Sequence, residues 1–388
     1  MARLGTQKKI ELGVPGQIMP PASAAVKFAQ RSEAEGFDAV WWPDHLMGWH
    51  PDTMWTPDLT PLADVQPNPH VYFDPAVMMG VVGAATERIK VGVCVTDLIR
   101  RHPAMAAQTA LTLDHVTQGR AIIGLGSGEQ LNATPYGMPF DTPVARLDEG
   151  IDVMRLLMDA DGPVDFEGRF HRLDKAVLGL SPYGATPPEI WTAAHGPRML
   201  RLTGRKADGW LPTKLGPTEY ATALGTIRES AEKADRDPDA ITPGMLGYVL
   251  MGPDAETVQR LTEAPLVRAL CVLLPAQVFR DLGVEGPYPS HPRSGAEPGH
   301  RTSSGFHDFI PTAIDRAESL RIIDAIPPAV VRHYAFCGTP DEVAEQVEEY
   351  VAHGLRHLVM WNITAFGDPS LARWSFGAMS ELRTRLGT

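Results

Sequence analysis

Short, mostly apolar runs alternate with longer stretches of helical spacing along most of this 388-residue chain. This alternation is typical of parallel β/α units, because each helix returns the chain to the same end of the sheet. The runs lack the apolar–polar alternation of a half-exposed strand, as expected of strands buried on both faces. Eight such units favour a closed (β/α)8 TIM barrel over an open sheet. The predicted strands are 10–14, 37–42, 88–96, 121–125, 189–194, 208–211, 245–251 and 357–363, and the predicted helices are 21–35, 103–116, 143–158 and one that begins near Pro197.

Two segments interrupt this rhythm, near residues 46–75 and 283–311, and both are rich in Pro together with Asp, Gly or Ser. Because α/β barrels often exceed the usual domain length, we expect residues 1–388 to form one barrel domain with these two insertions. Long loops on a barrel serve as lids or binding loops. Dimer contacts are the other role that we expect for them.

The charge balance and the cysteines limit the classes of partner. A formal net charge of -12 disfavours binding to the phosphate backbone of nucleic acids. Three cysteines give neither a disulfide framework nor a paired-thiol metal spacing, which favours the reducing cytoplasm. The amino-terminal residues lack the apolar region of a secretory signal. The apolar stretch 266–279 is interrupted by Arg268 and Pro275 and is too short to span a bilayer.

A carboxylate and an imidazole follow the second predicted strand. Asp44 and His45 come directly after Pro43, and Trp49 lies four residues further on. Histidine titrates near neutrality and therefore suits proton transfer at a strand end, where barrel enzymes gather their chemistry. A surface histidine beside a capping aspartate is an equally good interpretation of this pair alone.

A glycine-rich turn follows the fourth predicted strand. Its spacing does not fit the dinucleotide-binding fingerprint, and a tight turn between strand and helix explains the glycines by themselves. The residues in and after this turn are Gly126, Ser127, Gly128, Glu129 and Asn132.

The fifth predicted strand leads into a helix start with the features of a phosphate site. A glycine before a proline leaves backbone N–H groups free at the helix N-terminus, and an arginine adds positive charge. A plain helix start fits the pattern as well. The residues are Ala194, His195, Gly196, Pro197 and Arg198.

Other motifs add little. The third strand ends in Cys94, Val95 and Thr96, for which core packing is the default interpretation. The spacing of His, Cys and carboxylates matches no common metal motif, so we expect no metal.

Taken together, these stretches resemble the luciferase-like superfamily of flavin and deazaflavin enzymes along nearly the whole chain. Asp44 and His45 followed by Trp49, and the turn from Gly126 to Asn132, are similar to motifs of F420-dependent dehydrogenases. The stretches 92–97, 188–191 and 193–201 are similar to the phthiodiolone ketoreductase group, although Trp49 departs from the pattern of that group.

This resemblance implies binding of coenzyme F420, with FMN as the alternative cofactor. Asp44 and Gly128 would lie beside the deazaflavin ring, Cys94–Val95 would form a non-prolyl cis peptide behind it, and residues 194–198 would hold the cofactor phosphate. The cofactor-binding residues that we expect are Asp44, Cys94, Val95, Thr96, Gly126, Ser127, Gly128, Asn132, Ala194, His195, Gly196, Pro197 and Arg198.

The implied reaction is hydride transfer between the deazaflavin and a small-molecule or lipid-like ketone or alcohol, in a homodimer. We expect His45 to act as acid or base on the substrate oxygen, Trp49 to shape the pocket and Glu129 to handle a second proton. An FMN-dependent monooxygenase on the same barrel is the alternative function. A barrel that binds a ligand without turnover is the alternative outside enzymes.

Overall fold

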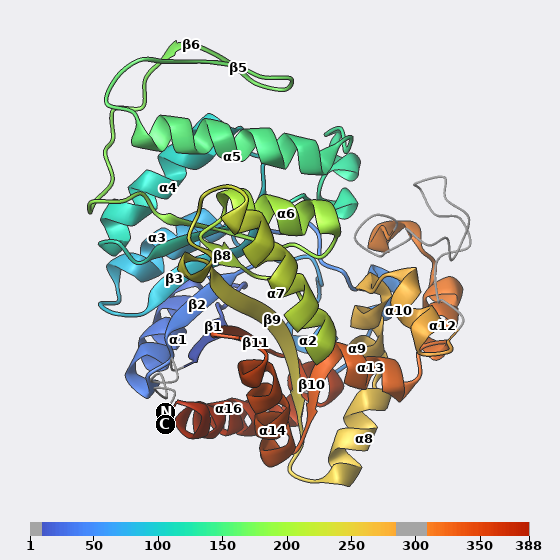
Figure 1. The fold of residues 1–388 in the computed structure, drawn as a ribbon. Helices are drawn as coiled ribbons and strands as arrows, with labels where there is room; N and C mark the ends of the chain where they lie inside the picture. Colours follow the sequence, from blue (N-terminus) through green and yellow to red (C-terminus); the bar gives the residue numbers. More distant parts are fainter. Residues whose placement is uncertain (1–9, 285–308, 388) are drawn as a thin grey trace.

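The computed structural model describes residues 10–284 and 309–387, and at its centre eight parallel strands close into a barrel (Figure 1). Each strand pairs with its neighbours in the order β9-β11-β1-β2-β3-β4-β7-β8, and β8 pairs back onto β9. The fold class and all eight predicted strands are confirmed, with ends shifted by up to three residues. The strands are β1 (Glu11–Pro15), β2 (Ala39–Trp42), β3 (Lys90–Asp97), β4 (Ala121–Gly126), β7 (Glu189–Thr192), β8 (Gly209–Trp210), β9 (Thr242–Met251) and β11 (His357–Asn362).

Helices cover the outside of the barrel, and most of them begin at or just after a proline. Proline suits the first helical turn because its missing N–H would be unpaired there. At the end of the first helix, Gly36 adopts a φ of 86°, the left-handed conformation that a glycine C-cap supplies. The covering helices are α1 (Ala22–Glu35), α3 (Pro75–Ala84), α4 (Pro103–Thr117), α5 (Pro143–Asp159), α6 (Pro197–Lys206), α7 (Pro217–Glu232), α14 (Pro340–Ala352) and α16 (Ala372–Leu386).

Three short strands were not predicted. An antiparallel hairpin of β5 (Val164–Glu167) and β6 (Arg172–Ala176) extends away from the barrel beyond α5 (Figure 1). The third, β10 (Ala335–Gly338), pairs with the C-terminal half of β9 on the edge opposite to β11. β5 and β6 are half exposed and carry charged residues, so they lack the buried apolar run that marked the barrel strands.

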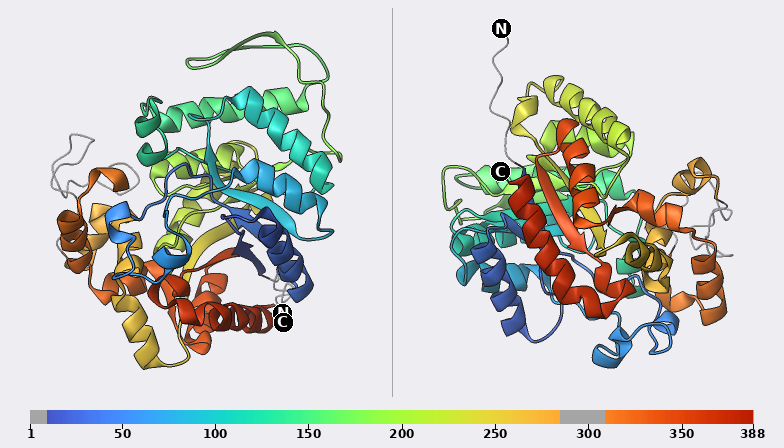
Figure 2. Two further views of the ribbon diagram at one scale, coloured as in Figure 1. Left: turned by 180° about the vertical axis from the view of Figure 1, so that it is seen from behind. Right: turned by 90° about the horizontal axis from the view of Figure 1, so that it is seen from below.

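The chain between β9 and β10 forms a helical insertion that lies beside the barrel (Figure 2). Its described helices are α8 (Ala255–Glu263), α9 (Pro265–Leu270), α10 (Ala276–Asp281), α12 (Arg316–Asp324) and α13 (Pro328–Tyr334). They share a hydrophobic core with β9 and β10 that includes Val267, Phe279 and Val331. The interruption therefore begins at residue 252, earlier than the predicted 283, and residues 285–308 of the predicted insertion lie outside the described residues.

The predicted insertion near 46–75 contains a short 3-10 helix, Asp52–Met54, and the short helix α2 (Leu62–Val65). His50 fixes this segment to the helical insertion, because its Nε2 lies 3.2 Å from the carbonyl oxygen of Leu266. The His50 ring also packs against Trp55 and Phe366.

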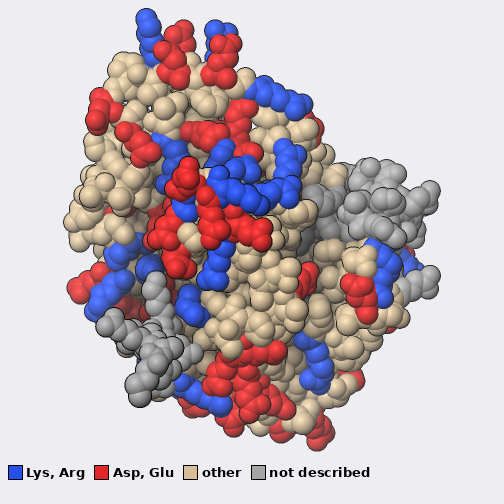
Figure 3. All heavy atoms as spheres, viewed as in Figure 1, with Lys and Arg blue, Asp and Glu red and all other residues tan. Residues whose placement is uncertain are grey.

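The surface carries interspersed charges. On the face shown in Figure 3, basic side chains of α6 lie among acidic ones, and Lys206 bridges Asp148 and Asp152 at 2.6 and 2.7 Å. No helix within residues 10–284 and 309–387 is both long and apolar enough to cross a membrane.

Candidate active site at the C-terminal rim of the barrel

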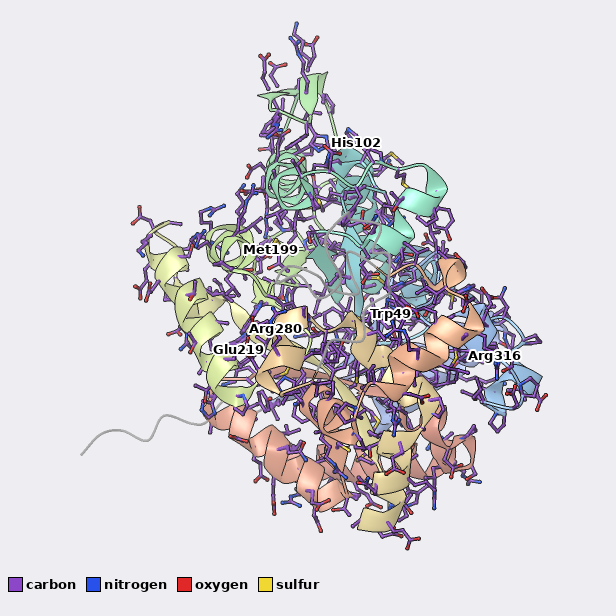
Figure 4. All side chains as sticks on the ribbon, turned by 90° about the vertical axis from the view of Figure 1, so that its right-hand side faces the viewer. Trp49, His102, Met199, Glu219, Arg280 and Arg316 are labelled. Atoms are coloured by element: carbon purple, nitrogen blue, oxygen red, sulfur yellow. The ribbon has the colours of Figure 1, made fainter. Side chains whose placement is uncertain are left out.

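The predicted site residues follow four different strands and meet at one end of the barrel. Because all eight strands run parallel, their C-terminal ends share one rim, where barrel enzymes hold their active sites. In the side view of Figure 4, Trp49 from the loop after β2 lies beside the helical insertion, and Met199 at the start of α6 lies across the middle of the molecule from it.

A hydrogen-bond network joins the loop after β2 to the turn after β4. Asn132 is buried, and its Oδ1 accepts hydrogen bonds from the backbone N–H groups of Leu46 and Met47 at 2.8 and 3.2 Å. Its Nδ2 lies 2.9 Å from the Nδ1 of His45 and 2.9 Å from the Oε2 of Glu129. Three of the predicted residues, His45, Glu129 and Asn132, are therefore in direct contact.

This network fits both protonation states of His45. Because Oδ1 of Asn132 accepts from two backbone groups, its Nδ2 must be the donor, so Nδ1 of a neutral His45 accepts and Nε2 carries the proton. A protonated ring would instead donate from Nδ1, toward the carbonyl oxygen of Met47 at 3.2 Å and the Glu129 carboxylate at 3.6 Å. A residue with partners for both states suits general acid–base chemistry.

Two aromatic rings flank the imidazole, whose side chain is only 7% exposed. The Trp49 ring meets His45 edge-on, with centroids 4.7 Å apart, and the Tyr72 ring lies 5.3 Å away at a 37° tilt. The Nε1 of Trp49 is buried without a hydrogen-bond partner among the described residues. An unpaired buried donor at the rim is available to a bound polar group.

Asp44 lies beneath this network in a set of buried ion pairs. Its carboxylate contacts Arg100 at 3.2 Å and Arg101 at 3.1 Å, and Arg100 also pairs with Asp97 at 2.5 Å. Burial disfavours the charged carboxylate, but the two guanidinium groups outweigh burial and hold the pKa of Asp44 below its usual value. The Asp44 carboxylate thus ties the His45 loop to the turn after β3, and its predicted place beside the cofactor ring stays a prediction.

The end of β3 carries the predicted backbone feature. The Cys94–Val95 peptide bond is cis, as the family resemblance implies, and the pairing of β3 with β4 shifts register between Val93 and Thr96. A Cβ on Gly126 would lie only 2.7 Å from the Val95 side chain, so this close approach requires glycine. Burial raises the pKa of the Cys94 thiol.

The rest of this rim comes from the turn after β4. Thr96 is buried at the end of β3, and Ser127 is half-buried between the two glycines. Gly128 has a φ of +87°, which an L-residue rarely adopts. Small residues thus bring the backbone of this turn close to the bulge of β3.

The N-terminus of α6 fits a phosphate. Gly196 is the N-cap and has no side chain to cap the helix, Pro197 follows it, and Arg198 is exposed. A Cβ on Gly196 would have no atom within 4 Å, so a ligand has room to approach. Free N–H groups at a helix start and a nearby guanidinium are the donors that phosphate prefers.

Two hydrogen bonds hold this helix start in place. Ala194 accepts a hydrogen bond from the Trp210 indole at 2.8 Å. The Nε2 of His195 accepts one from the Thr213 N–H at 3.2 Å, so a neutral His195 carries its proton on Nδ1. Among the described residues, no hydrogen bond or ring contact links residues 194–198 to the His45 network.

The sequence analysis missed several rim residues. Tyr72 lies in a segment without any pattern, so nothing in the sequence marks it. Arg100 and Arg101 follow Asp97 closely, and this alternation of charge directly after a strand was a usable signal for an ion-pair cluster. In the part of the chain that the structure describes, no group of three or more His, Cys, Asp or Glu side chains could hold a metal ion.

The barrel and its rim define the class of protein. The luciferase-like monooxygenase family matches residues 4–357, and the chain belongs to this family. It is 36% identical to the phthiodiolone/phenolphthiodiolone dimycocerosates ketoreductase of Mycobacterium tuberculosis over 359 residues, which are 92% of this chain and 91% of the relative. The F420-dependent glucose-6-phosphate dehydrogenase of Nakamurella multipartita is 30% identical, over 92% of this chain and 89% of the relative.

The fold has a matching solved structure. An F420-dependent secondary alcohol dehydrogenase in complex with an F420–acetone adduct superposes with a TM-score of 0.70 at 22% identity, covering 93% of this chain and 96% of that one. This likeness supports the architecture of the barrel, while the two curated relatives, both oxidoreductases by name, bear on the chemistry.

Proposed function

We propose that this protein is an F420-dependent oxidoreductase that transfers a hydride between the deazaflavin and a ketone or alcohol. The observation that carries this proposal is the contact of His45 with Asn132, Glu129 and Trp49 at the C-terminal rim. A reaction that interconverts C=O and CH–OH needs one proton at the substrate oxygen for each hydride at carbon. The His45 imidazole at this rim is a group of the acid–base type that such a proton transfer needs.

The residues of the rim fit the cofactor. The N-terminus of α6, with Gly196 and Arg198, would hold the cofactor phosphate, and the turn Gly126–Gly128 with the Cys94–Val95 bulge would lie against the ring. When bound, the deazaflavin supplies a carbon centre that gives or accepts a hydride in one two-electron step. The FMN-dependent monooxygenase stays the alternative function, because FMN carries phosphate and a similar tricyclic ring.

In the reducing direction, the protonated imidazolium of His45 gives its Nε2 proton to the substrate oxygen and becomes neutral. Its Nδ1–H then faces the Met47 carbonyl oxygen and the Glu129 carboxylate. The Trp49 indole N–H, which has no partner among the described residues, would donate a second hydrogen bond to that oxygen. Glu129 would stabilise the ring of His45 while it is charged.

The neighbourhood of Trp49 favours a bulky apolar substrate. Met47, Leu131 and Ile310 form a small hydrophobic cluster against which Trp49 packs. An apolar wall gives little affinity to a charged sugar phosphate but suits a lipid-like ketone.

The homodimer also belongs to this proposal. Val77 and Val81 on α3 and Met105 on α4 are 63%, 43% and 60% exposed, and α3 packs directly beside α4. An exposed apolar face of this kind is a common site of subunit contact.

A titration with the two cofactors tests the proposal. The purified protein should bind F420 and quench its fluorescence, whereas FMN at the same concentration should bind weakly. With reduced F420 and a long-chain ketone, the protein should produce the alcohol without consuming oxygen. Tight binding of FMN together with oxygen consumption would instead establish the monooxygenase, and binding of neither cofactor would favour a barrel without turnover.

A further inference from the structure

We propose that Tyr72 is a positioning residue for His45, whose imidazole it holds through a ring contact. This inference rests on the proposed function, in which His45 exchanges a proton with the substrate. Tyr72 lies outside every motif of the sequence, between the loop after β2 and helix α3.

The first observation is the ring contact. The centroids of Tyr72 and His45 lie 5.3 Å apart at a tilt of 37°, while Trp49 meets the same imidazole at 82°. The Asn132 hydrogen bond holds the Nδ1 edge of the His45 ring. Two aromatic rings at different angles restrict tilting of the imidazole about that edge, so together with Asn132 they determine where Nε2 points.

The second observation is that the segment bearing Tyr72 is attached on both sides to the loop bearing His45. Two residues before Tyr72, the Nδ1 of His70 accepts a hydrogen bond from the Gly48 N–H at 3.1 Å. The Nε2 of His70 lies 3.1 Å from the Asp52 carboxylate, which fixes the histidine ring itself.

On the other side, Asp74 pairs with Arg101 at 2.7 Å, and Arg101 pairs with Asp44 at 3.1 Å. His70 and Tyr72 therefore contact the loop 44–52 directly, and Asp74 is linked to it through Arg101. A segment attached on both sides keeps a defined position, and a residue that positions a catalytic ring must itself be held in this way.

The third observation concerns the phenol. Burial and the nearby Glu129 carboxylate both raise the pKa of Tyr72, so the ring that packs on His45 is the neutral phenol. No described residue forms a hydrogen bond with its hydroxyl in this structure. The ring, rather than the hydroxyl, therefore makes the contact with His45.

Two variants separate these parts of the side chain. Tyr72→Leu removes the ring and should lower kcat by roughly 10- to 100-fold, because small displacements of a catalytic group cost rates of this size. The KM and the affinity for F420 should stay close to wild type. Tyr72→Phe keeps the ring and should restore kcat.

Tyr183→Leu is the matched control. Tyr183 is 51% exposed and also packs on a histidine, His115, with centroids 5.7 Å apart, but it lies at α4 on the outside of the barrel. Its replacement should leave kcat unchanged. Thermal melts of all three variants show whether a loss of kcat follows a loss of folded protein.

A second readout does not depend on turnover. Nitrogen-15 NMR of the histidine-labelled protein should show sharp ring resonances for His45 in the wild type and in Tyr72→Phe, and resonances broadened by motion of the ring in Tyr72→Leu. If Tyr72→Leu keeps both the signal and the kcat of the wild type, the inference is wrong even though the proposed function stands. If the wild type itself neither binds F420 nor turns over, the proposed function fails, and the NMR comparison still decides whether Tyr72 orients the ring.

Discussion

Asn132 allows the sharpest test of the rim, because one atom of its amide stabilises the loop after β2 and the other atom contacts the groups that transfer the proton. Its Oδ1 accepts from Leu46 and Met47, and its Nδ2 faces His45 and Glu129. Asn132→Leu leaves two backbone N–H groups without an acceptor. At about 1–3 kcal/mol for each unsatisfied group, the free energy of unfolding should fall by roughly 2–6 kcal/mol.

Asn132→Asp preserves the acceptor but places a carboxylate oxygen where Nδ2 lies, 2.9 Å from the Nδ1 of His45 and 2.9 Å from the Oε2 of Glu129. The new carboxylate stabilises the protonated imidazolium, which weakens His45 as an acid, and it repels Glu129, which displaces the ring from its position. The kcat should fall by at least about 100-fold, the lower end of what a positioned acid contributes.

Urea unfolding and steady-state turnover of both variants, compared with wild type, measure the two effects. We expect Asn132→Leu to show the larger loss of stability, and Asn132→Asp to lose turnover while F420 still binds. Wild-type turnover in Asn132→Asp would refute the assignment of the donor atom. An unchanged urea midpoint in Asn132→Leu would refute the role of Oδ1.

Two further predictions concern stability and assembly. Burial lowers the pKa of His50 to about 4, so the folded state keeps the ring neutral, while the unfolded chain protonates it below about pH 6.5. The free energy of unfolding is therefore unaffected by His50 above that pH. It falls by up to about 3 kcal/mol as the pH decreases toward 4. Urea unfolding at several pH values should show this slope in the wild type and a shallower one in His50→Gln, and equal slopes would contradict the burial of the ring. For the dimer, Val77→Lys combined with Met105→Lys should give a monomer in sedimentation velocity. The control Val65→Lys, at a residue 80% exposed in α2, should leave the dimer intact. A monomeric wild type would contradict this interface.

The eight barrel strands could be predicted because each is an apolar run bounded by proline, glycine or a helix signal. The rim followed from them, since parallel strands place their C-terminal residues at one end. This is why residues as distant in sequence as His45 and Asn132 could be grouped correctly before their contact was known. The family resemblance added the cis bond at Cys94–Val95, for which the residues alone gave no signal.

The parts that escaped prediction depend on contacts between distant segments. The helical insertion after β9 is stabilised by a core shared with that strand, which no local pattern reveals. The ion pairs of Asp44 with Arg100 and Arg101 depend on how two loops meet, which its motif alone does not reveal. Tyr72 shows the same limit, because its contact with His45 depends on how the long connection between β2 and α3 folds back on itself.

The most direct test of the account is a single-turnover experiment with reduced F420 and a long-chain ketone, in the wild type and in His45→Ala. The account predicts that both proteins bind F420 equally well, and that reoxidation of the cofactor is slower in His45→Ala by roughly 10²- to 10⁴-fold. Equal rates in the two proteins would contradict the claim that His45 provides the proton at this rim.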